Sequence, residues 1–542
     1  MKKNIGLAAD AARSALLWAA SNVSLYVFMA FFYTGVLTMG ILFYHHLEPV
    51  EMVGRYVLIP WGMALCLLRL YKGAQSERKP SAELIPLGLL VFWLAVPYVM
   101  RFGLTVNNMD CWSWYASVYF GVYALASEES AARRESLMDT ICAVFLVFSL
   151  VYAGLALYTA YTVQALWEIP GSIYGFGICD GMYLRGGVHY NITGMIAVCS
   201  AMICLCGAAR WRFAPLRALS LTASVMMMVV VVLTQSRTAR YALIGALAAG
   251  AYALVAGTGK RTPLRRAMGA AVGGVVLVGA YLGMGAVSDA ALAHYDHVRA
   301  ARAYAAAQAL ATPEPAEAAE PARSFEPEEA LEPAESIDPE MNPESVQTPE
   351  MAPDAAANPD AGEGVEEPEA VASAPLAQEA TPVPVATPEP LVPREAVDAS
   401  FSGRTELWRN LLALWRDDPW HLLIGNGAGR SGGMVVEGTM HESLTEISLH
   451  NAYLQFVADF GLIGFVLKAL FFAFILRPVL RVFSAPRREL RGELALCMLV
   501  VACLLTGLME SAPLSWRTPM NVTLYFALGV LVSKGRELAQ RA

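Results

Sequence analysis

Uninterrupted apolar runs recur along most of this chain, and they restrict its fold more than any other feature. A run of about 18 or more apolar residues spans a bilayer as a helix, because a helix satisfies its own backbone hydrogen bonds where no water is present. Only 16% of the residues are charged, whereas an average soluble domain has about 25%. The sequence therefore predicts an all-α polytopic membrane protein.

A window of about 20 residues places about twelve transmembrane helices along the chain. The predicted spans are 22–44, 53–71, 83–101, 111–127, 138–162, 188–208, 216–235, 238–257, 266–287, 451–476, 493–511 and 518–533. The first is too long for a signal-peptide core and lacks a small-residue cleavage pattern, so we expect it to be retained.

Basic residues alternate from loop to loop, which tests the placement of the spans independently. The short loops after the even-numbered spans are rich in basic residues, whereas the opposite short loops carry few. The residues are Lys72, Arg78, Lys79, Arg133, Arg134, Arg210, Arg212, Arg217, Lys260, Arg261, Arg265, Arg266, Arg477, Arg481, Arg487, Arg488 and Arg491. By the positive-inside rule these loops and both termini are cytoplasmic.

One large loop, residues 288–449, falls on the extracytoplasmic side. Within it, residues 312–398 hold 22 acidic residues against two arginines, and 17 of the chain's 30 prolines. Such a segment cannot bury a core, so we expect a disordered insertion that acts as a spacer. The chain's net charge of −8 therefore leaves +12 on all other residues.

The flanks of this insertion are expected to be ordered. Residues 288–310 are alanine-rich and helical in character, and residues 400–449 contain an amphipathic helix suited to the membrane surface. The chain thus divides into residues 1–287 with nine spans, the loop 288–449, and residues 450–542 with three spans and a cytoplasmic tail.

A histidine lies where this loop becomes the tenth span. His450 stands at the N-terminal end of the predicted helix, where the helix dipole and a low dielectric both favour a neutral imidazole. Such an imidazole can accept a proton from a sugar hydroxyl. A capping or interfacial role is the alternative. His441 and His421 are rival candidates, but they lie within the loop rather than at its junction with the membrane.

Four arginines lie on the same predicted side as His450. Arg237 and Arg240 are three residues apart in a tight turn between two spans, Arg185 precedes two glycines, and Arg404 opens the amphipathic helix. Each alone fits a solvated or snorkelling side chain. Together they would suit a diphosphate, because a guanidinium is permanently charged and presents a fork of donors.

Other chemistries find little support. The nine cysteines lack paired metal-ligand spacing, and the Gly425-Asn426-Gly427 loop lacks the ending of a nucleotide-binding loop. We expect no metal, no cofactor and no nucleic-acid partner. Cys111 and Cys179 both fall on the extracytoplasmic side, where a disulfide could form.

The ordered motifs around the candidate residues resemble the O-antigen ligase and O-antigen polymerase superfamily. They are Arg185-Gly186…Asn191, Ser236-Arg237-Thr238-Ala239-Arg240, Gly403-Arg404…Trp408, Pro419…Gly425-Asn426-Gly427 and His450-Asn451-Ala452-Tyr453-Leu454…Gly461-Leu462-Ile463-Gly464. The resemblance implies a metal-independent, inverting glycosyltransferase of GT-C-like architecture. Such enzymes move a glycan from an undecaprenyl-diphosphate-linked donor onto an acceptor sugar, outside the cytoplasmic membrane.

The resemblance also implies roles for the individual residues. Arg237 and Arg404 would bind the donor diphosphate, Arg185 would add a further contact, and His450 would activate the acceptor hydroxyl. The acidic, proline-rich insertion departs from the family pattern.

The sequence does not separate a ligase from a polymerase. A lipid-linked oligosaccharide flippase, or another secondary transporter, would also use about twelve spans. No internal repeat of the kind common in transporters is visible. A sensor that displays the acidic loop is a third reading, but the short cytoplasmic loops hold no signalling domain.

Overall fold

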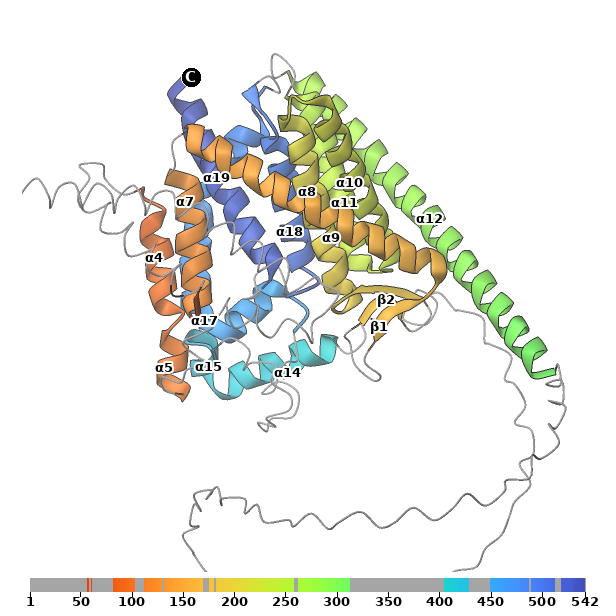
Figure 1. The fold of residues 1–542 in the computed structure, drawn as a ribbon. Coiled ribbons are helices and arrows are strands. Elements are labelled where there is room, and N and C mark those ends of the chain that lie inside the picture. The colour runs from red at the N-terminus through yellow and green to blue at the C-terminus, as the bar shows by residue number, and fades with distance from the viewer. Residues whose placement is uncertain are drawn as a thin grey trace, which may run out of the picture. The chain divides into compact units, whose positions relative to one another are not determined.

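The structure is a computed structural model, and it describes residues 56–57, 60, 81–102, 112–128, 131–168, 175–179, 182–257, 262–311, 404–427, 449–486, 489–511 and 518–541. These residues are mostly helical (Figure 1). The chain forms two compact units, residues 1–302 with 390–542, and residues 303–389. The predicted span 22–44, nearly all of span 53–71, and the insertion 312–398 lie outside the described residues.

Most of the remaining predicted spans correspond to helices. These are α4 (Leu84–Trp93), α5 (Val96–Phe102), the π-helix η3 (Ser117–Val122), α7 (Tyr123–Glu128), α8 (Ala131–Thr162), α9 (Tyr190–Arg210), α10 (Ala214–Leu233), α11 (Arg237–Ala256), α12 (Pro263–Ala311), α17 (Ala452–Phe483), α18 (Glu493–Gly507) and α19 (Pro519–Arg541). In the described part of the chain, six helices are long and apolar enough to cross a membrane: Arg134–Thr162, Tyr190–Arg210, Ala214–Leu233, Arg237–Ala256, Pro263–Gln308 and Ala452–Phe483.

These helices confirm a polytopic membrane protein, while the total of about twelve spans stays a prediction. The main difference along the bundle is α12. The predicted span 266–287 and the alanine-rich segment 288–310 form one continuous helix, because no glycine–proline break separates them and alanine has the highest helix propensity.

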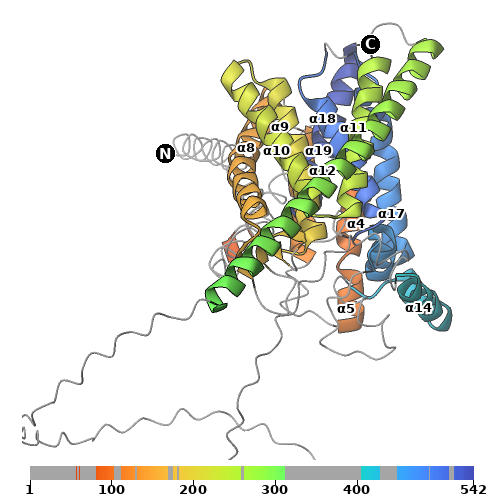
Figure 2. The ribbon, with the colours of Figure 1, turned by 90° about the vertical axis from the view of Figure 1, so that its right-hand side faces the viewer.

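Helix α9 forms the centre of the bundle and packs against α8, α10, α11 and α18. Small residues let its neighbours approach closely, as is common between membrane helices. A Cβ on Gly194 would lie 2.6 Å from the Cβ of Ala239 on α11. Helix α12 runs along the outside of this group (Figures 1 and 2), and most of its apolar side chains are exposed, as expected of a helix that faces lipid.

A small antiparallel sheet between α8 and α9 corrects the all-α prediction. Its strands are β1 (Ala165–Glu168), β2 (Gly175–Cys179) and β3 (Tyr183–Gly186), in the order β1-β2-β3. Strands of four or five residues are too short to show a clear alternating pattern in the sequence. The sheet is fixed to the helices at Gly186, whose N–H donates to Thr193 Oγ1 on α9 and whose carbonyl accepts from the Tyr152 hydroxyl on α8.

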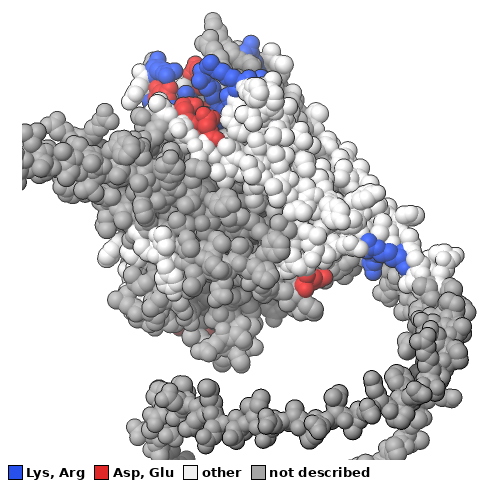
Figure 3. All heavy atoms as spheres, in the orientation of Figure 1, with Lys and Arg blue, Asp and Glu red and all other residues white. Residues whose placement is uncertain are grey.

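Charged side chains gather at the end of the bundle where the C-terminus lies, as Figure 3 shows for one face. Arg134 pairs with Glu537 at 2.6 Å, and Arg210 pairs with Glu135 at 2.8 Å. Partial burial raises the pKa of Glu537, but the hydrogen bond from Arg134 and the nearby charges outweigh it and lower the pKa overall. Helices α9, α11, α17 and α19 begin at the opposite end (Figure 1), and the candidate site lies there.

Candidate active site

Four segments of the chain meet at one carboxylate, that of Glu510, which follows α18 and is only 6% exposed. Its Oε1 accepts from Asn191 Nδ2 at 2.8 Å and from Arg404 Nη2 at 3.3 Å. Its Oε2 lies 3.1 Å from His450 Nδ1. Asn191 belongs to the first turn of α9, Arg404 opens α14 (Arg404–Asp417), and His450 lies just before α17. Glu510 thus brings together the two strongest candidates from the sequence, His450 and Arg404.

The backbone of His450 adopts an unusual conformation. Its φ is +51°, in the left-handed region that few non-glycine residues occupy. The residues on either side are held firmly: Trp408 Nε1 donates to the carbonyl of Leu449 at 3.0 Å, and Asn451 donates to the carbonyl of Leu508 at 3.1 Å. Asn451 also caps α17 by accepting from two backbone N–H groups of its first turn. Strain that is fixed by surrounding contacts in this way is concentrated at functional sites.

The contact with Glu510 bears on which nitrogen of His450 can act as a base. An ionised carboxylate only accepts hydrogen bonds, so Nδ1 must carry the hydrogen in this contact. The neutral ring then has its lone pair on Nε2, the nitrogen that would accept a proton. The His450 side chain is 37% exposed, so a substrate can approach it. The arrangement suits a general base oriented by a buried carboxylate.

Arg404 is held at two points beside this base. Nη1 donates to the carbonyl of Met509 at 3.1 Å, and Nη2 donates to Glu510. Both acceptors belong to the segment that follows α18. A guanidinium anchored along one edge can still offer its other donors to an anionic ligand.

Arg185 lies near this group but pairs with a different carboxylate. It is buried on β3, and its Nη1 is 3.7 Å from Glu168 Oε1 on β1. The next residue, Gly186, is bonded to Thr193 in the first turn of α9, the turn that also carries Asn191. Arg185 therefore lies on a strand bonded to the turn that carries Asn191, and its ion pair is with Glu168.

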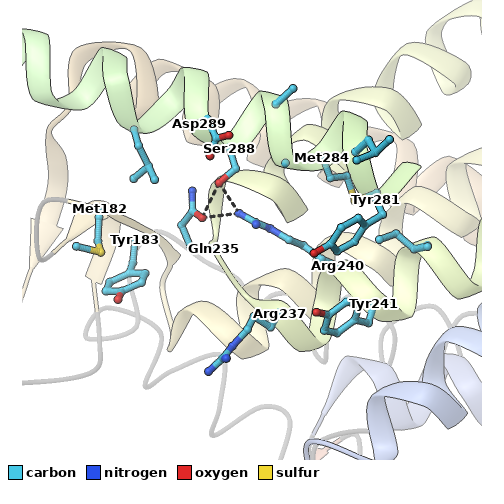
Figure 4. Close-up of a pocket in the computed structure, with 15 residues that line it drawn as sticks. Met182, Tyr183, Gln235, Arg237, Arg240, Tyr241, Tyr281, Met284, Ser288 and Asp289 are labelled. Atoms are coloured by element: carbon cyan, nitrogen blue, oxygen red, sulfur yellow. Dashed lines mark hydrogen bonds between the residues drawn. The ribbon is translucent and has the colours of Figure 1, made fainter. Parts of the chain in front are cut away.

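The two arginines of α11 point in different directions. Arg240 Nη2 donates to the carbonyl of Val232 and to Ser288 Oγ, both at 2.9 Å, and to Gln235 Oε1. In Figure 4, Arg237 extends away from this polar group. The structure thus brings His450 and Arg404 together at Glu510 and pairs Arg185 with Glu168. It places Arg237 at the start of α11 and directs Arg240 towards α12.

The rival histidine and the glycine loop have structural contacts. His421 is buried in α15 (Pro419–Leu423), where its Nε2 lies 3.2 Å from Asp418 Oδ2 and its Nδ1 is hydrogen-bonded to Asn426.

The glycine loop that follows α15 packs against α17 at Gly461, where the helix is kinked with φ +70°. Three backbone carbonyls just before the kink accept hydrogen bonds from outside the helix. The Ala458 carbonyl accepts from Asn426 N at 3.0 Å and the Asp459 carbonyl from Gly427 N at 2.7 Å. The Phe460 carbonyl accepts from Trp93 Nε1 at 2.8 Å. His441 lies outside the described residues, as does Cys111, so the disulfide with Cys179 stays a prediction.

Sequence patterns alone did not single out Glu510. Its contacts are with residues 60, 106 and 319 positions away, which no local pattern reveals. One signal was present, because Glu510 is an acidic residue at the end of a predicted span, and ionisable residues in such places are usually functional.

An apolar helix bundle with a cluster of polar side chains at one end defines a multi-pass membrane protein. Residues 222–469 match the family model described as O-antigen ligase. This match confirms the resemblance to the O-antigen ligase and polymerase superfamily. The matched range contains Arg237, Arg240, Arg404 and His450, whereas Glu510 lies beyond it. A comparison with curated proteins gives no match.

Proposed function

We propose that this protein is a glycosyltransferase of the cytoplasmic membrane that transfers or polymerises a glycan of the cell surface. The donor would be an undecaprenyl-diphosphate-linked glycan, and the acceptor a sugar on a second glycan or lipid. The observation that carries the proposal is the shared carboxylate of Glu510, which holds a candidate base and a candidate diphosphate ligand side by side.

The reaction needs one proton transfer and one displacement. His450 Nε2 accepts the proton of the acceptor hydroxyl as the oxygen forms a bond to the anomeric carbon of the donor. The bond between that carbon and the diphosphate oxygen breaks, and polyprenyl diphosphate leaves. Attack from the face opposite the leaving group inverts the anomeric centre. Glu510 stabilises the imidazolium that forms, in the manner of an aspartate beside a catalytic histidine.

The charge that develops on the leaving diphosphate requires cations. Arg404 and Arg237 would supply them, with Arg185 and Arg240 nearby. In other enzymes a metal ion neutralises the charge on a leaving diphosphate. Guanidinium groups can do the same here, so the proposed transfer is metal-independent. The end of the bundle with the candidate site would be extracytoplasmic, and the charged end would be cytoplasmic. This orientation agrees with the positive-inside rule, which predicts that the basic loops and both termini are cytoplasmic.

A flippase or other secondary transporter is the second candidate, and Lys468 favours it. This residue lies in α17 and is only 4% exposed, with its Nζ 3.2 Å from the Tyr119 hydroxyl and 3.8 Å from the centre of the Phe456 ring. A buried cation within a membrane span is costly and often marks a transport route. A Lys468→Met variant addresses this alternative: a transporter would lose translocation, whereas a transferase would keep its transfer rate.

An assay in detergent separates the two functions, because translocation has no meaning without a bilayer. The purified full-length chain is mixed with a lipid-linked glycan and an acceptor glycan, and products are followed by mass spectrometry. We expect a longer or ligated glycan together with polyprenyl diphosphate in equal amounts. The transporter would be favoured if the donor stays intact after prolonged incubation in detergent while the same protein moves that lipid across the membrane of vesicles.

A further inference from the structure

An ion pair crosses the middle strand of the small sheet. Arg185 on β3 and Glu168 on β1 lie on opposite sides of β2, and Arg185 Nη1 is 3.7 Å from Glu168 Oε1. Their paired residues on β2 are Gly177 and Gly175, which have no side chains to keep the two charged groups apart. Residues that pair across neighbouring strands share one face of a sheet, so both charged groups lie on the same face.

The two members of this pair differ in exposure. The Arg185 side chain is 8% exposed, whereas that of Glu168 is 37% exposed. A ligand that approaches this face therefore meets the carboxylate of Glu168 before the guanidinium of Arg185. An ionised carboxylate only accepts hydrogen bonds, so it suits a ligand that offers hydroxyl or amide donors.

Three aromatic rings continue from the same face of the sheet. Tyr183 shares this face with Arg185, because side chains two residues apart on a strand point the same way. Its ring stacks on that of Tyr190, with centroids 4.7 Å apart, and the Tyr190 ring lies 3.9 Å from the ring of His189. Tyr190 is buried, but Tyr183 and His189 are half-buried. Glu168, Arg185 and the three rings form one surface, which we name the sheet surface.

The sheet surface connects two parts of the candidate site. At one end, His189 Nδ1 accepts from the backbone N–H of Asn191, whose side chain donates to Glu510 at 2.8 Å. At the other end, Tyr183 and Arg237 line the same cavity of about 390 Å³, and in Figure 4 both point away from α12. A ligand on the sheet surface would therefore lie beside the Glu510 cluster and beside a predicted diphosphate ligand.

We propose that the sheet surface binds the sugar joined to the donor diphosphate, and that Glu168 selects neutral sugars over acidic ones. The apolar C–H face of a pyranose packs on the ring of Tyr183, and its hydroxyl groups donate to Glu168. Aromatic walls with a few placed polar groups are typical of small-molecule sites. A sugar carboxylate would instead meet a like charge, which is the usual way to exclude a wrong ligand. This inference rests on the proposed function, because it takes the donor to be a lipid-linked glycan.

Binding of three short donor analogues tests the sugar site without any transfer. They are farnesyl diphosphate alone, farnesyl diphosphate joined to N-acetylglucosamine, and farnesyl diphosphate joined to glucuronic acid. Each is titrated into the full-length protein in detergent by calorimetry. We expect N-acetylglucosamine to lower Kd about tenfold, the effect of one hydrogen bond to a charged group, and glucuronic acid to give no gain. Equal Kd values for all three analogues would overturn the proposal.

Glu168→Gln tests the selection against acidic sugars. The variant keeps the size of the side chain but removes the charge that repels a sugar carboxylate, and Arg185 can then pair with that carboxylate. We expect the two sugar analogues to bind this variant with equal Kd. A Glu168→Gln protein that keeps the wild-type preference for N-acetylglucosamine would contradict the role of Glu168.

Tyr183→Ala tests the aromatic part of the surface. Without the ring, the gain in affinity from N-acetylglucosamine should be lost, while the Kd of farnesyl diphosphate stays at the wild-type value. Tyr158→Ala is the matched control, because Tyr158 is an exposed tyrosine of α8 outside the sheet surface, and it should bind all three analogues as the wild type does. An unchanged gain in Tyr183→Ala would refute packing of the sugar on this ring.

The outcomes separate this inference from the proposed function. A wild-type protein that prefers the neutral analogue but transfers no glycan would refute the transferase and keep the sugar site. A protein that transfers glycan from neutral and acidic donors with the same kcat/KM would refute selection by Glu168 and keep the transferase.

Discussion

Glu510 contacts His450 and Arg404 through different oxygens, so its charge acts on both. In Glu510→Gln one of these oxygens becomes an NH₂ group, which cannot accept from either partner. Loss of a hydrogen bond to a charged group costs about 1.5–3 kcal/mol, or about 10- to 150-fold in rate. We expect kcat to fall by that factor, measured in the detergent transfer assay. Glu135→Gln, at the charged end of the bundle, is the control and should keep the wild-type rate.

Arg404 tests the binding of the diphosphate. Lysine keeps the positive charge but loses the fork of donors that suits two phosphate oxygens. In Arg404→Lys we expect KM for the lipid-linked donor to rise about tenfold, the effect of about 1.4 kcal/mol, with KM for the acceptor unchanged. Arg409 is exposed on the same helix, and Arg409→Lys should match the wild type. Equal donor KM in both variants would remove Arg404 from the diphosphate site.

At this scale the sequence indicated two of the residues that meet at Glu510, but not Glu510 itself. His450 and Arg404 stood out because charged and titratable residues are rare beside membrane spans. Glu510 did not, since its importance comes from contacts with Asn191, Arg404 and His450 that are distant in sequence. Arg240 stays a predicted diphosphate ligand. Its hydrogen bonds to Val232, Gln235 and Ser288 direct the side chain towards α12, a direction that spacing alone cannot predict.

Helix α17 begins just after His450 and is kinked at Gly461, and this kink can be tested as an element. A Cβ on Gly461 would lie 2.1 Å from the carbonyl oxygen of Leu423, and φ there is +70°. Gly461→Ala should therefore destabilise the protein by about 2 kcal/mol or more, because both the backbone and the loop after α15 must move. Thermal unfolding in detergent measures the loss. Gly279→Ala, where nothing lies within 4 Å, should unfold at the wild-type temperature or slightly above it.

At the scale of the elements, the length of the apolar runs predicted the helices well, because a segment that crosses a bilayer needs a long run of apolar residues. Packing between elements was harder to predict. The position of the amphipathic helix α14 on the membrane surface stays a prediction. Leu411 on this helix packs against Leu449 and Ala458, which holds the residue next to His450. An apolar stripe looks the same in sequence whether protein or lipid covers it.

For the whole molecule, the acidic insertion is the largest feature without a role in the proposed chemistry. Its composition predicts a spacer, and both candidate residues of the loop, Arg404 and His450, follow it. Deletion of residues 320–385 should therefore leave the transfer rate within about twofold of wild type, since a flexible spacer contributes little to an active site. If the deletion variant enters the membrane normally but no longer transfers glycan, the acidic segment has a role in the reaction.

The account depends most on His450 as the base, and one rate comparison tests it. Transfer by purified His450→Ala is compared with that by His297→Ala, an exposed histidine of α12, at saturating donor and acceptor. Loss of a general base lowers the rate by about 10²- to 10⁴-fold, so we predict a fall of that size in His450→Ala and no change in His297→Ala. A His450→Ala protein that folds, binds donor and transfers glycan at the wild-type rate would contradict the account.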